Sequence, residues 1–173
     1  HKMALKADRN ELDVDISFFY NEGTAERGGI VILDTVGSGA AMDQAGAKVK
    51  YAVAAGNAIA VGVLLNDVVN LDLTRQHINW HKDEVQKGGK VSVLKKGYVV
   101  TNLIGSTAPT AGALAYLDDV AGNEGYFAMK ADVASGKYIQ VGRFMSTKDE
   151  DGYAKVEVNL PATFDNADGG VPE

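Results

Sequence analysis

Two stretches of this chain repeat one pattern. Residues 54–65 align without a gap with residues 134–145, and both contain a Gly turn followed by an apolar stretch with Val-Gly at its centre. Five positions are identical: Ala54, Gly56, Ile59, Val61 and Gly62 correspond to Ala134, Gly136, Ile139, Val141 and Gly142. An apolar run that ends in Leu-Asp precedes each stretch, and an alternating Lys-Val-x-Val follows each. The repetition predicts a mainly β fold in which two related β units, products of an internal duplication, form a compact barrel or sandwich.

The repetition also predicts how the chain is organised. The first copy is longer than the second because residues 66–87 have no counterpart in the second copy, where a short charged turn takes their place. Sequence outside both copies is polar and rich in glycine, which predicts flexible ends. The expected parts are an N-terminal arm (1–28), a first β unit with the insertion 66–87 (29–105), a second β unit (106–161) and a flexible acidic tail (162–173).

Composition excludes several classes of function. The net charge of −6 argues against general nucleic-acid binding, which needs a basic surface to displace counterions. The absence of cysteine excludes disulfides, thiolate nucleophiles and cysteine-ligated zinc. No apolar run approaches the length of a membrane span, so no membrane partner is expected. With 173 residues, 46% of them hydrophobic, the chain suits one domain or two small domains that pack closely.

The insertion 66–87 holds the residues with the most chemistry. His77 and His81 are four positions apart, which on a helix would place both imidazoles on one face, as a zinc pair requires. Asp83 and Glu84 could add oxygen ligands, but no third firm ligand is evident, and the histidines of an ordinary surface loop fit the sequence better. Trp80 suits either a core position or a protein interface, and Arg75 is another residue type that anchors interfaces.

The predicted N-terminal arm contains one apolar hook. Ile16, Phe18, Phe19 and Tyr20 lie between polar stretches and outside both copies of the repeat. Such a hook could become ordered on a partner surface. We therefore expect residues of the hook and of the insertion to form the interface with a partner: Ile16, Phe18, Phe19, Tyr20, Arg75, His77, Trp80 and His81.

Four short motifs carry a resemblance to a known family. They are Gly97-Tyr98-Val99-Val100, Pro109-x-x-Gly112-x-x-x-Tyr116, Ile139-Gln140-Val141-Gly142-Arg143 and Lys155-Val156-Glu157-Val158. With the duplicated Leu-Asp and Val-Gly strands, they resemble the small β-barrel units of head decoration (cement) proteins of tailed bacteriophages. The resemblance covers residues 28–161. This chain departs from the smallest members in having two such units and the insertion.

The resemblance implies a structural protein of the virion. It implies a decoration protein that binds the outer surface of the assembled head and stabilises contacts between shell subunits. The implied partners are the major capsid protein and further copies of the chain, with a trimer favoured; no cofactor and no enzymatic activity are expected. One alternative is a small metal-dependent β-barrel hydrolase that uses His77, His81 and Asp83, and another is a phage tail adaptor.

Overall fold

The structure of the chain is a computed structural model that describes residues 4–23, 25–34, 47–54, 58–67, 84–85, 88–160 and 165–166. This part of the chain is mainly β, as predicted, and its only helical element is one short 3-10 turn, η2 (Lys130–Asp132). The strands are β1 (Asn10–Tyr20), β2 (Ala25–Glu26), β3 (Ile30–Asp34), β4 (Ala47–Tyr51), β5 (Ala60–Asp67), β6 (Glu84–Val85), β7 (Lys90–Thr101), β8 (Leu114–Leu117), β9 (Phe127–Ala128), β10 (Tyr138–Phe144), β11 (Ala154–Asn159) and β12 (Asp165–Asn166).

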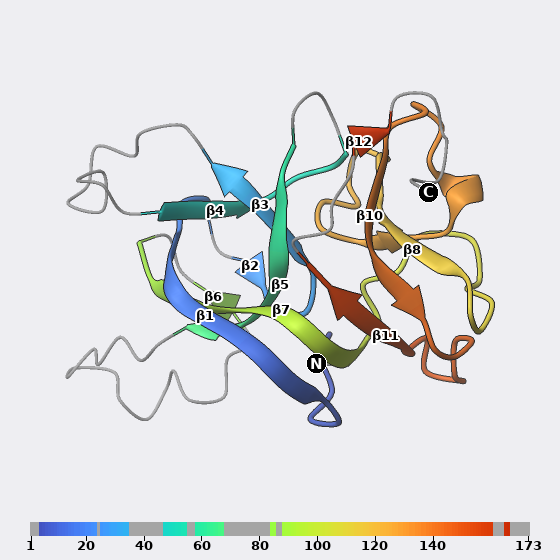
Figure 1. Cartoon of the computed structure of the whole chain (residues 1–173), viewed down its shortest axis with the longest axis horizontal. Helices are drawn as coiled ribbons and strands as arrows, with labels where there is room; N and C mark the ends of the chain where they lie inside the picture. Colours follow the sequence, from blue (N-terminus) through green and yellow to red (C-terminus); the bar gives the residue numbers. More distant parts are fainter. Residues whose placement is uncertain are drawn as a thin grey trace.

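Most strands join one large sheet, and the long strand β7 runs through its middle (Figure 1). The order is β1-β4-β3-β5-β7-β11-β10-β8-β9, and β12 pairs with β10. Because β1 pairs with both β4 and β7, the strands β1, β4, β3, β5 and β7 are hydrogen-bonded in a closed circuit. The C-terminal half of β7 pairs with β11, from Thr101↔Ala154 to Lys96↔Asn159, and so joins the circuit to the second set of strands.

Two main clusters of apolar side chains hold these strands together. Nearly all members of the smaller cluster come from the five strands of the closed circuit, among them Tyr20 and Leu64. The larger cluster joins the circuit to the second set and includes Leu94, Phe127 and Phe144. Strands β3 and β5 contribute alternate residues to both clusters, so both of their faces are buried. That explains why their sequences are almost continuously apolar rather than alternating.

The two stretches that align in the sequence lie in strands with similar neighbours in the sheet. On one side of β7 the order is β5-β3-β4, and beyond β11 the order is β10-β8-β9. Each central strand has a bulge at the valine of its Val-Gly pair: the pairing with β3 skips Val61, and the pairing with β8 skips Val141. Gly62 then pairs with Val31, and Gly142 pairs with Ala115.

The segment predicted to be an N-terminal arm is instead part of the body. Residues 10–20 form β1, which pairs with β7 along most of its length. Phe18 and Tyr20 are buried in the smaller cluster, and the ring of Tyr20 contacts that of Tyr51 edge-on at 6.1 Å. Burial raises the pKa of the Tyr20 hydroxyl. The prediction of a flexible arm is therefore corrected for these residues: the two aromatic side chains fill the core of their own chain.

The ends and the insertion are described only in part. Asp165 and Asn166 form β12, which pairs with β10, so at these two positions the predicted flexible tail is paired to the sheet. Within the insertion, β5 extends to Asp67, and β6 pairs with β2. Residues 68–83 and 86–87, with most of the predicted tail, lie outside the described residues.

Candidate functional site

Two apolar side chains on β1 are exposed although they belong to a strand of the main sheet. Leu12 is 74% exposed and Ile16 is 53% exposed, the first and third most exposed large apolar side chains among the described residues. We call this pair the β1 ridge. In the pairing with β7, Glu11 faces Gly97 and Asp13 faces Lys96, so Leu12 has no partner in the ladder. A second irregularity between Asp15 and Phe18 leaves Ile16 out of the register in the same way. Bulges of this kind re-aim side chains, and here they turn two apolar groups toward solvent.

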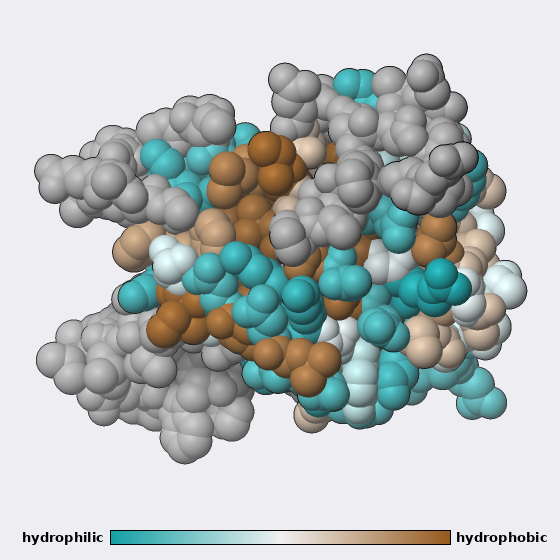
Figure 2. Space-filling view, viewed as in Figure 1, coloured by the Kyte–Doolittle hydropathy of each residue, from teal (hydrophilic) through white to brown (hydrophobic). Residues whose placement is uncertain are grey.

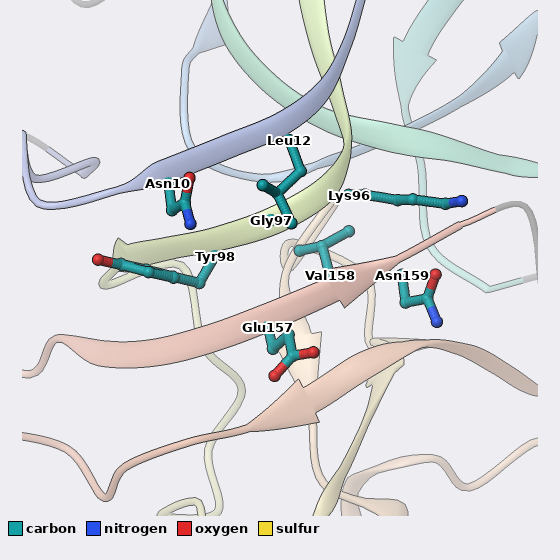
Figure 3. A pocket seen from close by; sticks show the side chains of 8 residues that line it. All are labelled: Asn10, Leu12, Lys96, Gly97, Tyr98, Glu157, Val158 and Asn159. Atoms are coloured by element: carbon teal, nitrogen blue, oxygen red, sulfur yellow. The ribbon is translucent and has the colours of Figure 1, made fainter.

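A groove lies beside Leu12, where β1 crosses β7 (Figure 3). The crossing is close: a side chain at Gly97 would overlap the carbonyl oxygen of Asn10, and its φ of 139° also suits glycine. In the close-up, Leu12 and Val158 lie together in the groove, while Lys96 extends away from Leu12. The groove has a volume of about 390 Å³ and is lined by Asn10, Leu12, Lys96, Gly97, Tyr98, Glu157, Val158 and Asn159.

Carboxylates flank the β1 ridge. β1 carries three acidic residues, Glu11, Asp13 and Asp15, and no lysine or arginine. Hydrogen bonds from the hydroxyl and the amide of Ser17 lower the pKa of Asp15, and its ion pair with Lys95, at 3.1 Å, acts in the same direction. Asp15 is therefore charged at neutral pH. The surface view shows apolar patches along the position of β1 with hydrophilic residues around them (Figure 2).

This arrangement suits binding to another macromolecule better than chemistry on a small molecule. The groove is open to solvent and of mixed polarity, and the side chains of the β1 ridge are exposed. In the described part of the chain, no three His, Cys, Asp or Glu side chains are grouped so that they could hold a metal ion. Nor does any helix in the described residues have the length and apolar character to cross a membrane.

Comparison with known protein families gives the context of this surface. Residues 10–159 match the family described as Structural cement protein (E217 gp24/Pam3 gp6). The chain belongs to this family. No curated protein matches it. The family match begins at the first residue of β1 and ends at the last residue of β11, so it includes the β1 ridge and both sets of strands.

Membership makes this cement protein a structural component of a phage virion, located in the capsid, with a role in stabilising the shell. The resemblance seen in the sequence is thus confirmed at the level of the family. The family also favours a structural rather than an enzymatic role.

The structure separates the four hook residues that the sequence grouped. Ile16 is exposed on the β1 ridge, and Phe19 is partly buried. Phe18 and Tyr20 are core residues, so they are not available to a partner unless β1 detaches. The other expected interface residues of the cement protein, Arg75, His77, Trp80 and His81, lie outside the described residues, as does Asp83.

Sequence reasoning missed Leu12, the most exposed residue of the ridge. The signal was present: apolar residues stand at positions 12, 14, 16, 18 and 20, the period of two that is typical of a strand. The acidic residues between them made this segment look like a polar arm. Alternation alone would still have placed all five side chains on one face, whereas the bulges turn Leu12 and Ile16 outward.

Proposed function

We propose that this cement protein binds the outer surface of the assembled head and stabilises contacts between neighbouring shell subunits. The observation that carries the proposal is the β1 ridge, because Leu12 and Ile16 are exposed on a strand whose other end is anchored in the core. Apolar side chains held outward on a rigid strand lose little conformational entropy when they bind. A protein of the capsid with such a surface is suited to a fixed contact with the shell.

The body behind the ridge supports a bridging role. β7 belongs to both sets of strands, so a force applied at one set is carried to the other through a continuous hydrogen-bonded sheet. We propose that the chain also self-associates, with a trimer favoured, since several linked copies would gain avidity on a repeating lattice. The residues Arg75, His77, Trp80 and His81 remain candidates for one of these interfaces.

The test uses heads assembled without this protein. Purified protein is added at increasing concentration, and bound copies are counted after the heads are separated by sedimentation. Saturable binding to the heads, together with an increase in the temperature at which the heads release DNA, is expected. Labelling of bound protein by a reagent that cannot enter the head reports the side of the shell. Protection of the bound protein from that reagent would contradict binding to the outer surface.

We also propose that the two sets of strands arose by internal duplication and that the closed circuit of the first set is a small β-barrel. The matching strand orders, and the bulges at Val61 and Val141, support the duplication. The continuous pairing from β1 through β4, β3, β5 and β7 back to β1 supports the barrel. An experimental structure in which the strands that carry Gly62 and Gly142 had unrelated neighbours would refute the duplication.

A further inference from the structure

Strand β1 has one edge that no described strand covers over most of its length. One edge pairs with β7 from Asn10 to Phe19. The other edge pairs with β4, but only at Phe18, Phe19 and Tyr20. Among the described residues, positions 10–17 therefore present an open strand edge, and Figure 1 shows β1 at the margin of the molecule there. Unpaired N–H and C=O groups at such an edge form a template for another strand.

Not all of this edge can accept a strand. The amide of Ser17 already donates to the Asp15 carboxylate at 2.7 Å, which closes a local turn. The segment that remains is Asn10–Asp15, and it contains Leu12, the more exposed residue of the ridge. An incoming strand along this segment would lie beside Leu12, on the side of β1 that faces away from β7.

Charge restricts what such a strand can carry. Asp15 is engaged by Lys95, and Glu11 forms an ion pair with Arg9. Asp13 is exposed and forms no ion pair among those found in the described part of the chain. A partner strand with lysine or arginine opposite these carboxylates is favoured, and an acidic strand is repelled.

We infer that the open edge of β1, over residues 10–15, binds an extended segment of a shell subunit as an added strand, and that this segment combines apolar residues with lysine or arginine. The inference rests on the proposed function and identifies the part of the shell that is recognised. In strand addition the main-chain hydrogen bonds supply affinity, and alternate side chains supply specificity. Here an apolar residue of the partner would cover Leu12, and a basic residue would face Asp13.

The first arm of the test measures binding of variants to heads that lack the protein. Leu12→Ser removes the apolar contact. Because 74% of the Leu12 side chain is available for burial, the protein concentration at half-saturation of the heads should rise about tenfold. In Asp13→Lys the charge is reversed, and a rise of about threefold to tenfold is expected, smaller at high salt. Matched controls make the same changes at exposed positions of the second set, Val120→Ser and Glu150→Lys, and should bind as the unmodified protein does.

The second arm distinguishes an added strand from a contact of side chains alone. Hydrogen exchange is measured by mass spectrometry on the free protein and on the protein bound to heads. Amides within residues 10–15 should gain protection on the heads, whereas the Ser17 amide, already bonded to Asp15, should change little. Far-UV circular dichroism and thermal unfolding of each variant confirm that it is folded.

Each outcome has a separate meaning. Weakened binding of both variants with new protection at residues 10–15 supports the inference. Weakened binding without new protection refutes strand addition, and binding equal to that of the controls refutes the edge as the recognised surface; in both cases the proposed function stands. If the unmodified protein does not bind heads at all, the proposed function fails, and the inference fails with it.

Discussion

Replacing Gly142 by alanine should destabilise the protein because the sheet leaves no room for a side chain at this position. Gly142 lies in the middle of β10 and pairs with Val158 of β11 on one side and with Ala115 of β8 on the other. A Cβ atom added here would overlap the carbonyl oxygen of Glu157, and the next nearest atoms are also backbone atoms of β11. A flexible side chain could move aside, but a paired strand cannot move without weakening its hydrogen bonds.

The expected cost is that of overpacking a well-packed region, about 1–3 kcal/mol in the free energy of unfolding. For a chain of this length, each kcal/mol lowers Tm by about 2–4 °C, so the variant should unfold about 2–12 °C below the unmodified protein. Gly62→Ala should behave alike, because its Cβ would overlap the carbonyl oxygen of Leu94 on β7. The similarity of the two costs would also support the correspondence of the two sets of strands.

The assay is urea unfolding followed by fluorescence and circular dichroism, with Gly23→Ala as the control. Gly23 has no atom within 4 Å of an added Cβ and no positive φ, so alanine fits there without strain. Surface substitutions of this kind change stability by less than about 0.5 kcal/mol. If Gly142→Ala is no more destabilising than Gly23→Ala, the backbone of β11 does not lie close enough to Gly142 to exclude a side chain there.

Three further predictions concern β1 and the insertion. Deleting residues 3–20 should abolish cooperative thermal unfolding; a truncated protein that remains stably folded would restore the prediction of a flexible arm. Tyr20→Ala should lower the free energy of unfolding by about 3–5 kcal/mol, because Tyr20 is a fully buried core residue. Asp15→Ala should be less stable than the unmodified protein at pH 7. Because the folded-state pKa of Asp15 is below the usual 3.8, its stabilisation is present above 3.8 and declines as the pH falls from 3.8 through the lower folded-state pKa; a gap in Tm that does not narrow as the pH is lowered below 3.8 would contradict this. Trp80→Ala should weaken binding to heads while the β body stays folded; unfolding of this variant, with head binding unchanged, would place Trp80 in the core.

The mainly β character of the chain and the special backbone position of its strand glycines could be predicted from the sequence, because both leave local patterns in it. A glycine within a buried strand marks a bulge or a close approach of another backbone, and Gly62 has both: a bulge at Val61 and the carbonyl of Leu94 against it. What the pattern could not provide is the pairing of distant strands. Nothing in residues 10–20 indicates that they pair with residues 90–98, since the choice among possible partner strands depends on the packing of the whole core.

The candidate site was only half accessible from sequence, for a related reason. Composition identified an apolar cluster near the N-terminus, but burial divides it: Phe18 and Tyr20 pack inward, and Ile16 is exposed. Irregularities in the pairing of β1 with β7 cause this division. They arise where one strand has more residues than the other between two successive paired positions. One irregularity lies beside Gly97, where the backbone of β7 is in contact with that of β1 at Asn10. The sequence neighbours of Gly97 do not reveal that contact.

The features of β1 that invite a partner also limit which partner can bind. Exposed strand edges lead to aggregation unless bulges, charges or coverage prevent it, and β1 has three register irregularities and three carboxylates. A second copy of β1 aligned along the same edge would bring three more carboxylates against them, and like charges directly opposite are destabilising. A basic strand meets no such penalty, and the apolar side chain of Leu12 gives it an additional contact. The same charges therefore oppose self-association through this edge while the protein is free and favour a basic segment once a shell surface is present.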